Sequence, residues 1–215
     1  MEKAKSDIEK IEAFISEGHD LNTFQWFGQT LLQRACLKGD IKSVKLLIEN
    51  KADLNINSES GWTTLDFAIY NGRIKIVELL INAGSIIDNT SLYTASCKRR
   101  SNIIKLLIHK GANIKESQDA LLAAGFHGFP EIIELLVKAG MDVNHQDHLG
   151  QTVLMYASEK GQVQSSKHHE TVKKLLELNA DPSIRNRDGK TALDLATYKN
   201  QSEIILLLNA LKKHQ

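Results

Sequence analysis

The chain has 215 residues, of which 42% are hydrophobic and 25% are charged, a composition typical of a soluble globular protein with a sizeable core. Its 27 Lys and Arg residues nearly balance its 26 Asp and Glu residues, so charge favours neither a nucleic-acid nor a membrane partner. No apolar run reaches the roughly 18 residues that cross a bilayer, and the opening sequence MEKAKSDIEK lacks the apolar stretch of a secretion signal. We therefore expect a cytoplasmic protein, with secretion of an effector by a signal-independent route left open.

The first predicted element is an amphipathic helix in the sequence IEKIEAFISEGHDLN, residues 8–22. Its apolar residues share one side, and its charged residues lie elsewhere. The last predicted helix ends in the polar sequence KKHQ. Both terminal helices are therefore predicted to keep one face in solvent.

A phrase of 13 residues recurs four times after this first helix. The copies are GQTLLQRACLKGD, GWTTLDFAIYNGR, GQTVLMYASEKGQ and GKTALDLATYKNQ, and each has Thr two residues after Gly and Ala five residues after Thr. Gly28 and Gly61 are 33 positions apart, as are Gly39 and Gly72. A fixed period of this length is the signature of a repeat architecture.

Each phrase is followed by an apolar block that predicts a second helix, as in VKLLIENKADLN, VELLINAGSIID and VKKLLELNADPS. Gly84, Gly111 and Gly140 follow such blocks, where a left-handed residue ends a helix. Asn179 is the next best residue for that conformation, and Lys51 is a poor substitute.

With its period of 33 residues, the chain resembles the ankyrin repeat family. Two weaker units fit the same frame, TSLYTASCKRRSNIIKLLIHKGAN and DALLAAGFHGFPEIIELLVKAGMDVN. The resemblance implies an all-α solenoid of stacked helix pairs with short β-hairpin turns, in one domain over residues 1–215. The predicted units are about 1–22, 23–55, 56–88, 89–115, 116–144, 145–183 and 184–215. The Pro and His that the family usually has after the Thr are absent from every unit.

The distance from each helix stop to the next Thr predicts which units carry a projecting hairpin, here called a finger. It is 12 residues in four places, before Thr30, Thr63, Thr152 and Thr191. It is only 6 residues from Gly84 to Thr90 and 8 from Gly111 to Asp119, so the fourth and fifth units should lack fingers and leave a groove. A further insertion, QVQSSKHH, follows Gly161 and is interpreted as a solvated loop that includes His168 and His169.

The resemblance also implies that finger tips and exposed positions of the first helices bind a protein partner. The predicted binding residues are Phe24, Trp26, Phe27, Leu37, Lys38, Trp62, Tyr70, Lys98, Arg99, Phe126, His127 and Tyr198. The three rings in TFQWFGQT, residues 23–30, are either anchors for the partner or a cap over the incomplete first unit. If Trp62 is an anchor, its removal should weaken binding with little change in melting temperature.

The sequence gives little support for a metal site, a disulfide or a catalytic site. The sequence NHQDH places His145, Asp147 and His148 together, but Asp147 is interpreted as support for a turn rather than a metal ligand. Cys36 and Cys97 are too few for a zinc cluster, and we expect reduced thiols. No phosphate-binding loop, dinucleotide motif or nucleophile elbow is present, so no catalytic residue, metal or cofactor is predicted.

The predicted function is a non-catalytic protein-protein interaction module that is monomeric when unbound. Resemblance to stand-alone bacterial ankyrin proteins suggests an effector or adaptor, or alternatively an immunity protein that neutralises a toxin enzyme. An enzyme or a regulatory subunit of an enzyme is a competing class, with Tyr93, Lys98 and His127 over the groove as its candidate residues. A structural spacer is the remaining alternative.

Overall fold

A computed structural model describes residues 7–24, 27–159 and 165–212. In these ranges the chain forms thirteen helices and no β-strand, as the all-α prediction requires. The helices are α1 (Asp7–Ser16), α2 (Leu31–Lys38), α3 (Ile41–Glu49), α4 (Thr64–Tyr70), α5 (Ile74–Asn82), α6 (Asn89–Cys97), α7 (Ser101–His109), α8 (Asp119–His127), α9 (Pro130–Lys138), α10 (Val153–Glu159), α11 (Ser165–Glu177), α12 (Ala192–Tyr198) and α13 (Ser202–Lys212).

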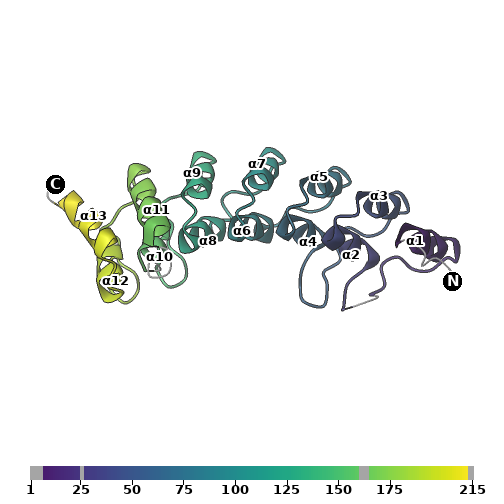
Figure 1. The fold of residues 1–215 in the computed structure, drawn as a ribbon, viewed down its shortest axis with the longest axis horizontal. Helices are drawn as coiled ribbons and strands as arrows, with labels where there is room; N and C mark the ends of the chain where they lie inside the picture. Colours follow the sequence, from purple (N-terminus) through teal and green to yellow (C-terminus); the bar gives the residue numbers. More distant parts are fainter. Residues whose placement is uncertain (1–6, 25–26, 160–164, 213–215) are drawn as a thin grey trace.

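The helices form two parallel rows (Figure 1). The inner row contains the even-numbered helices α2 to α12, each packed on the next, and the outer row contains the odd-numbered helices. Helix α1 lies in the outer row beside α3, and residues 7–24 contain no inner helix to pair with it. The predicted stack of helix pairs, with a lone second helix at its start, is confirmed.

The repeated Thr begins the inner helices. The side chain of Thr30 accepts a hydrogen bond from the Gln33 N–H, and the Gln33 side chain accepts one from the Thr30 N–H at 2.9 Å. Thr63 and Thr191 form the same reciprocal box with Asp66 and Asp194. Each box satisfies two N–H groups that a helix start otherwise leaves without partners. Gln and Asp at this position therefore stabilise the helix starts in the absence of the family's usual residues.

The core runs along the stack as one series of aliphatic side chains. The second residue after the repeated Thr, or after its equivalent, is at most 1% exposed in five inner helices: Leu32, Leu65, Leu92, Leu121 and Leu154. Matching outer-helix positions are fully buried: Val44, Val77, Ile104, Ile133 and Val172. Since each unit buries its apolar face against its neighbours, stability depends on the stack rather than on any single unit.

The helix stops have the predicted left-handed conformation. Gly84 has φ +99°, and Lys51 and Asn179 are held at φ +63° and +64°. A left-handed residue with a Cβ is strained by about 1 to 2 kcal/mol, and glycine relieves that strain.

We expect Lys51→Gly to raise the free energy of unfolding by about 1 kcal/mol, because Lys51 is exposed and only its backbone strain changes. Chemical denaturation followed by circular dichroism measures the effect. The matched reverse variant is Gly84→Lys, whose Cβ would meet no atom within 4 Å and which should lose a similar amount. Equal stability of the two variants would contradict this explanation.

The insertion in the sixth unit differs from the prediction. Helix α11 begins at Ser165, so the segment that contains His168 and His169 is helical rather than a loop, while residues 160–164 lie outside the described residues. His168 is buried, and its Nε2 lies 3.2 Å from the Phe126 carbonyl oxygen. The insertion therefore extends an outer helix far enough to place this ring against α8.

Candidate protein-binding surface

The fingers form two pairs. Within the N-terminal pair, before α2 and α4, the Glu59 N–H donates to the Gly28 carbonyl at 3.1 Å. Within the C-terminal pair, before α10 and α12, the Arg187 N–H donates to the Leu149 carbonyl at 3.0 Å. Only the short connections 83–88 and 110–118 precede α6 and α8 (Figure 1). The inner row is thus left without fingers between the two pairs.

Aromatic and basic side chains lie at the ends of α4, α6 and α8. The Lys98 Nζ atom is 4.0 Å from the centre of the Tyr70 ring, and that ring meets Trp62 edge-on at 5.0 Å. His127 contacts Phe126 edge-on, with 5.2 Å between ring centres. We call Tyr70, Lys98, Arg99, Phe126 and His127 the central floor. It presents ring faces and cationic groups together, a combination common in protein-binding hot spots.

Two arginines connect neighbouring units at the ends of the inner helices. The Arg100 Nη2 atom donates to the Tyr70 carbonyl at 2.9 Å, and Gly72 leaves room for the Arg100 guanidinium. Arg73 reaches back in the same way toward the carbonyl of Lys38, at 3.4 Å. These two arginines link the end of one inner helix to the next unit. Sequence reasoning did not identify this role.

Arg99 combines a strained backbone with two side-chain contacts. Its φ is +55°, its guanidinium forms an ion pair with Glu131, and it lies 5.4 Å from the centre of the Phe129 ring. Phe129 in turn stacks on His127 at 5.6 Å. Gly39, Gly72 and Gly128 have the same left-handed conformation after other inner helices, so the backbone of Arg99 follows the repeat and only its side chain is particular to this unit.

The positive character of the floor comes from its lysine and arginine residues. Burial lowers the pKa of His127 below its usual value, and the nearby Lys98 and His168 lower it further. The His127 ring is therefore neutral at pH 7, and Lys98 carries the exposed positive charge beside it.

The C-terminal finger pair is braced against α10. The Tyr156 hydroxyl donates to the Asp147 carboxylate at 2.7 Å, and the N–H groups of Leu149 and Gln151 donate to the same carboxylate at 2.8 Å. Burial opposes ionisation of Asp147, but these hydrogen bonds outweigh it and lower its pKa. Burial and the bond to Asp147 raise the pKa of Tyr156 to about 12. Asp147 thus supports the turn, as the sequence indicates.

The described residues also bear on whether the chain has a metal site, a disulfide or a membrane span. Among them, no group of three or more His, Cys, Asp and Glu residues could hold a metal ion. Cys36 and Cys97 are free thiols in the structure, and burial raises the pKa of each. None of the helices described is long and apolar enough to span a bilayer.

Comparison with known proteins agrees with the repeat pattern. The family model for ankyrin repeats in three copies matches residues 1–91 and 120–214. The chain belongs to the ankyrin repeat family. Ankyrin repeats are generally non-catalytic modules that bind other proteins.

Known ankyrin proteins match this chain over different shares of its length and of their own. The ankyrin repeat and KH domain-containing protein mask-1 of Caenorhabditis elegans is 33% identical over 114 residues, which are 50% of this chain and only 4% of mask-1. An ankyrin repeat domain from Acinetobacter baumannii is 29% identical, with a TM-score of 0.71 and coverage of 83% of this chain and 96% of that one. A chain in the complex of the Bdellovibrio bacteriovorus predatory endopeptidase Bd0816 with the immunity protein Bd3460 is 25% identical, with a TM-score of 0.73 and coverage of 85% and 98%.

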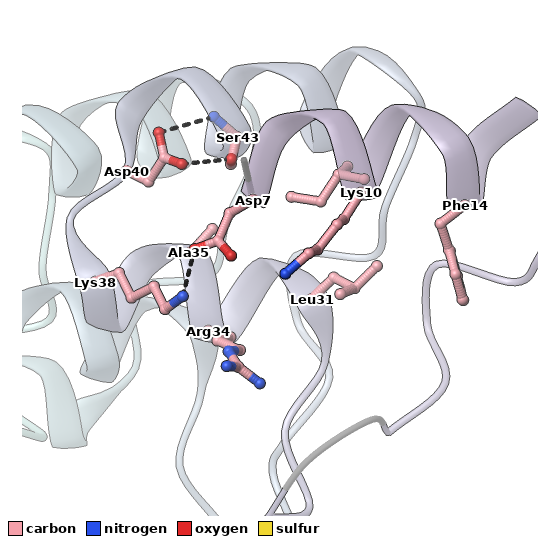
Figure 2. Close-up of a pocket in the computed structure, with 10 residues that line it drawn as sticks. Asp7, Lys10, Phe14, Leu31, Arg34, Ala35, Lys38, Asp40 and Ser43 are labelled. Carbon is pink, nitrogen blue, oxygen red and sulfur yellow. Dashed lines mark hydrogen bonds and ion pairs between the residues drawn. The ribbon is translucent and has the colours of Figure 1, made fainter. Parts of the chain in front are cut away.

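The predicted binding residues of this ankyrin stack fall into separate groups. Trp62 and the five floor residues lie along the stretch from α4 to α8. Lys38 is instead paired with Asp7 of α1 (Figure 2), and Leu37 is partly exposed at the end of α2. Tyr198, 70% exposed, lies at the other end of the stack near Lys190 and Lys199.

Phe27 of the first finger does not act as a cap over the first unit. Phe27 is 94% exposed and Phe24 is 47% exposed, and neither lines the opening beside α1. Trp26 lies outside the described residues. Phe27 also has φ +54°, so a strained and exposed ring stands at the tip of the finger. The cap interpretation is therefore wrong for Phe27.

Proposed function

We propose that this ankyrin stack binds a protein partner through its central floor, with the two finger pairs on either side. The observation that carries the proposal is the exposed Lys98, which follows the fingerless helix α6 and lies over the Tyr70 ring at the end of α4. A projecting segment of the partner fits such a gap, and acidic groups on it would meet Lys98 and Arg99. The chain acts by affinity, as a cytoplasmic monomer when unbound and without a catalytic residue or cofactor.

Phe27 extends this proposed surface beyond the floor. A fully exposed Phe in a left-handed conformation gains no packing within the chain, so its cost to folding is not offset there. Burial in a complex would offset it, because a large ring is a strong contributor to binding. We therefore place Phe27 among the anchors of the partner.

Two settings fit this activity. An effector or adaptor would bind the surface of a folded protein, whereas an immunity protein would bind and block a toxin enzyme. The second setting is supported by the similarity to a chain in the complex of a predatory endopeptidase with its immunity protein. Loss of the partner's catalytic activity on binding would distinguish the immunity function from an adaptor function.

Charge reversal tests the floor. The partner is first captured from cells with the wild-type chain and identified by mass spectrometry, and its affinity is then measured by calorimetry. Lys98→Glu should weaken binding about tenfold or more, because attraction to acidic groups becomes repulsion. The matched control is Lys105→Glu, on an exposed position of outer helix α7, which should bind as the wild type does. Equal affinity of the two variants would exclude the floor as the binding surface.

A further inference from the structure

Among the described residues, the inner row of helices begins at α2. Of the described helices, only α4 is an inner neighbour of α2, because α1 belongs to the outer row (Figure 1). In four later inner helices the residue after the repeated Thr is at most 1% exposed: Thr64, Ser91, Val153 and Ala192. Leu31 holds the same position in α2 but is only half-buried. A helix position that is covered elsewhere in the stack is therefore left partly exposed here by the described residues.

A pocket of about 250 Å³ lies on this face, between α1 and α2. Its apolar walls are Phe14 from α1 and Leu31 and Ala35 from α2 (Figure 2), together with Ile11 of α1. Pockets for drug-sized molecules are usually about 300 to 1,000 Å³, so this one suits a large side chain better than a free ligand.

The charges at the rim are only partly balanced. Asp7 is paired with Lys38, and Asp40 accepts hydrogen bonds from the Ser43 hydroxyl at 2.6 Å and from N–H groups at the start of α3. The two carboxylates that line the pocket, Asp7 and Asp40, thus already have partners within the chain. Lys10 also lines the pocket, beside Leu31 in Figure 2. Its charge helps to lower the pKa of Asp7, but it makes no hydrogen bond or ion pair with a described residue. An approaching carboxylate would be attracted to this lysine.

We infer that this pocket binds an amphipathic helix of a protein partner, which lies beside α2 and continues the inner row. The bound helix puts an apolar side chain between Phe14 and Leu31 and a carboxylate beside Lys10. Packed helices lie roughly 8 to 10 Å apart, so a bound helix at that distance from α2 would continue the inner row. A helix that lies in an apolar groove is a common mode of protein recognition. This surface is separate from the central floor, and the inference does not depend on the proposed function.

The probe is a synthetic, fluorescein-labelled helical peptide with Leu and Phe in an i, i+4 stripe and Glu residues beside it. Fluorescence anisotropy should show saturable binding to the wild-type chain, and a matched peptide with Lys in place of Glu should bind about tenfold more weakly. Lys10→Glu should reverse this preference. Lys75→Glu, on an exposed position of α5, is the control and should keep it. Equal binding of the two peptides to the wild type would overturn the inference.

A second pair of variants tests the pocket itself. Leu31→Glu should weaken binding of the Glu peptide about tenfold or more by placing a charge in the apolar wall, without loss of folding, since a carboxylate is favourable at a helix start. Leu206→Glu, at a position 72% exposed on α13, is the control. Full binding by Leu31→Glu, or no saturable binding by the wild type up to about 1 mM peptide, would refute the site. Sedimentation that shows wild-type self-association lost in Leu31→Glu would assign the pocket to a second copy instead and overturn the inference.

Discussion

Replacement of Trp62 by Ala is expected to lower the free energy of unfolding by about 2 to 3 kcal/mol. The Trp62 ring is partly buried against the core, 5.4 Å from the Phe67 ring and 5.0 Å from the Tyr70 ring. Its removal takes away both contacts and leaves Phe67 less covered. Urea denaturation followed by circular dichroism measures the loss. This packing alters the expectation from sequence that Trp62 could be removed with little change in melting temperature.

The matched control for this prediction is Phe27→Ala. Phe27 is 94% exposed, so its removal should change the free energy of unfolding by less than about 0.5 kcal/mol. The same variant should lose about thirtyfold in affinity for the partner if Phe27 is an anchor. Phe27 is therefore a cleaner test of binding than Trp62. Similar losses of stability in the two variants would contradict the difference in packing.

Gly125→Ala is expected to destabilise the stack by about 2 kcal/mol, although Ala is the better helix former by about 1 kcal/mol. Gly125 is buried within α8, where an added Cβ would lie 2.9 Å from the backbone oxygen of Val153 and would also clash with its Cγ2 methyl group. Backbone atoms cannot move aside as the end of a flexible side chain can. Helices α8 and α10 would have to separate, with loss of packing on both.

Thermal and urea denaturation of single and double variants test this explanation. Val153→Ala removes the methyl part of the clash, so it should destabilise the Gly125→Ala protein less than it destabilises the wild type. Removal of the methyl group should offset only part of the stability lost in Gly125→Ala, because the Val153 carbonyl remains in place. A Gly125→Ala protein more stable than the wild type would show that helix propensity outweighs the close approach.

Much of the fold could be predicted from the sequence, because it depends on local signals. The spacing of Gly and Thr located the helix starts, and Thr30 and Thr63 do cap α2 and α4. The stop at Lys51 could also be assigned from the repeat frame, although lysine does not favour that conformation. Intervals between stops and starts indicated where the connections are short, and 83–88 and 110–118 are the short ones.

The details of the surface depend on contacts between units, which a repeat pattern does not encode. Arg100 reaches the Tyr70 carbonyl from the next unit, and Lys38 turns toward Asp7 rather than toward the floor. His168 was placed in a loop because its neighbours are polar, yet its ring is buried against α8. The sequence contains one weak signal for the contact of Arg100 with Tyr70, because Gly72 leaves space where the Arg100 side chain passes.

Hydroxyl-radical footprinting of the complex with the captured partner tests the central claim most directly, because it measures the accessibility of individual side chains. Tyr70 and Phe126 are exposed in the free chain and should become strongly protected on binding. Leu206, on the outer helix α13, should be modified equally in the free and bound chains. Unchanged modification of Tyr70 and Phe126 in a saturated complex would contradict binding at the central floor.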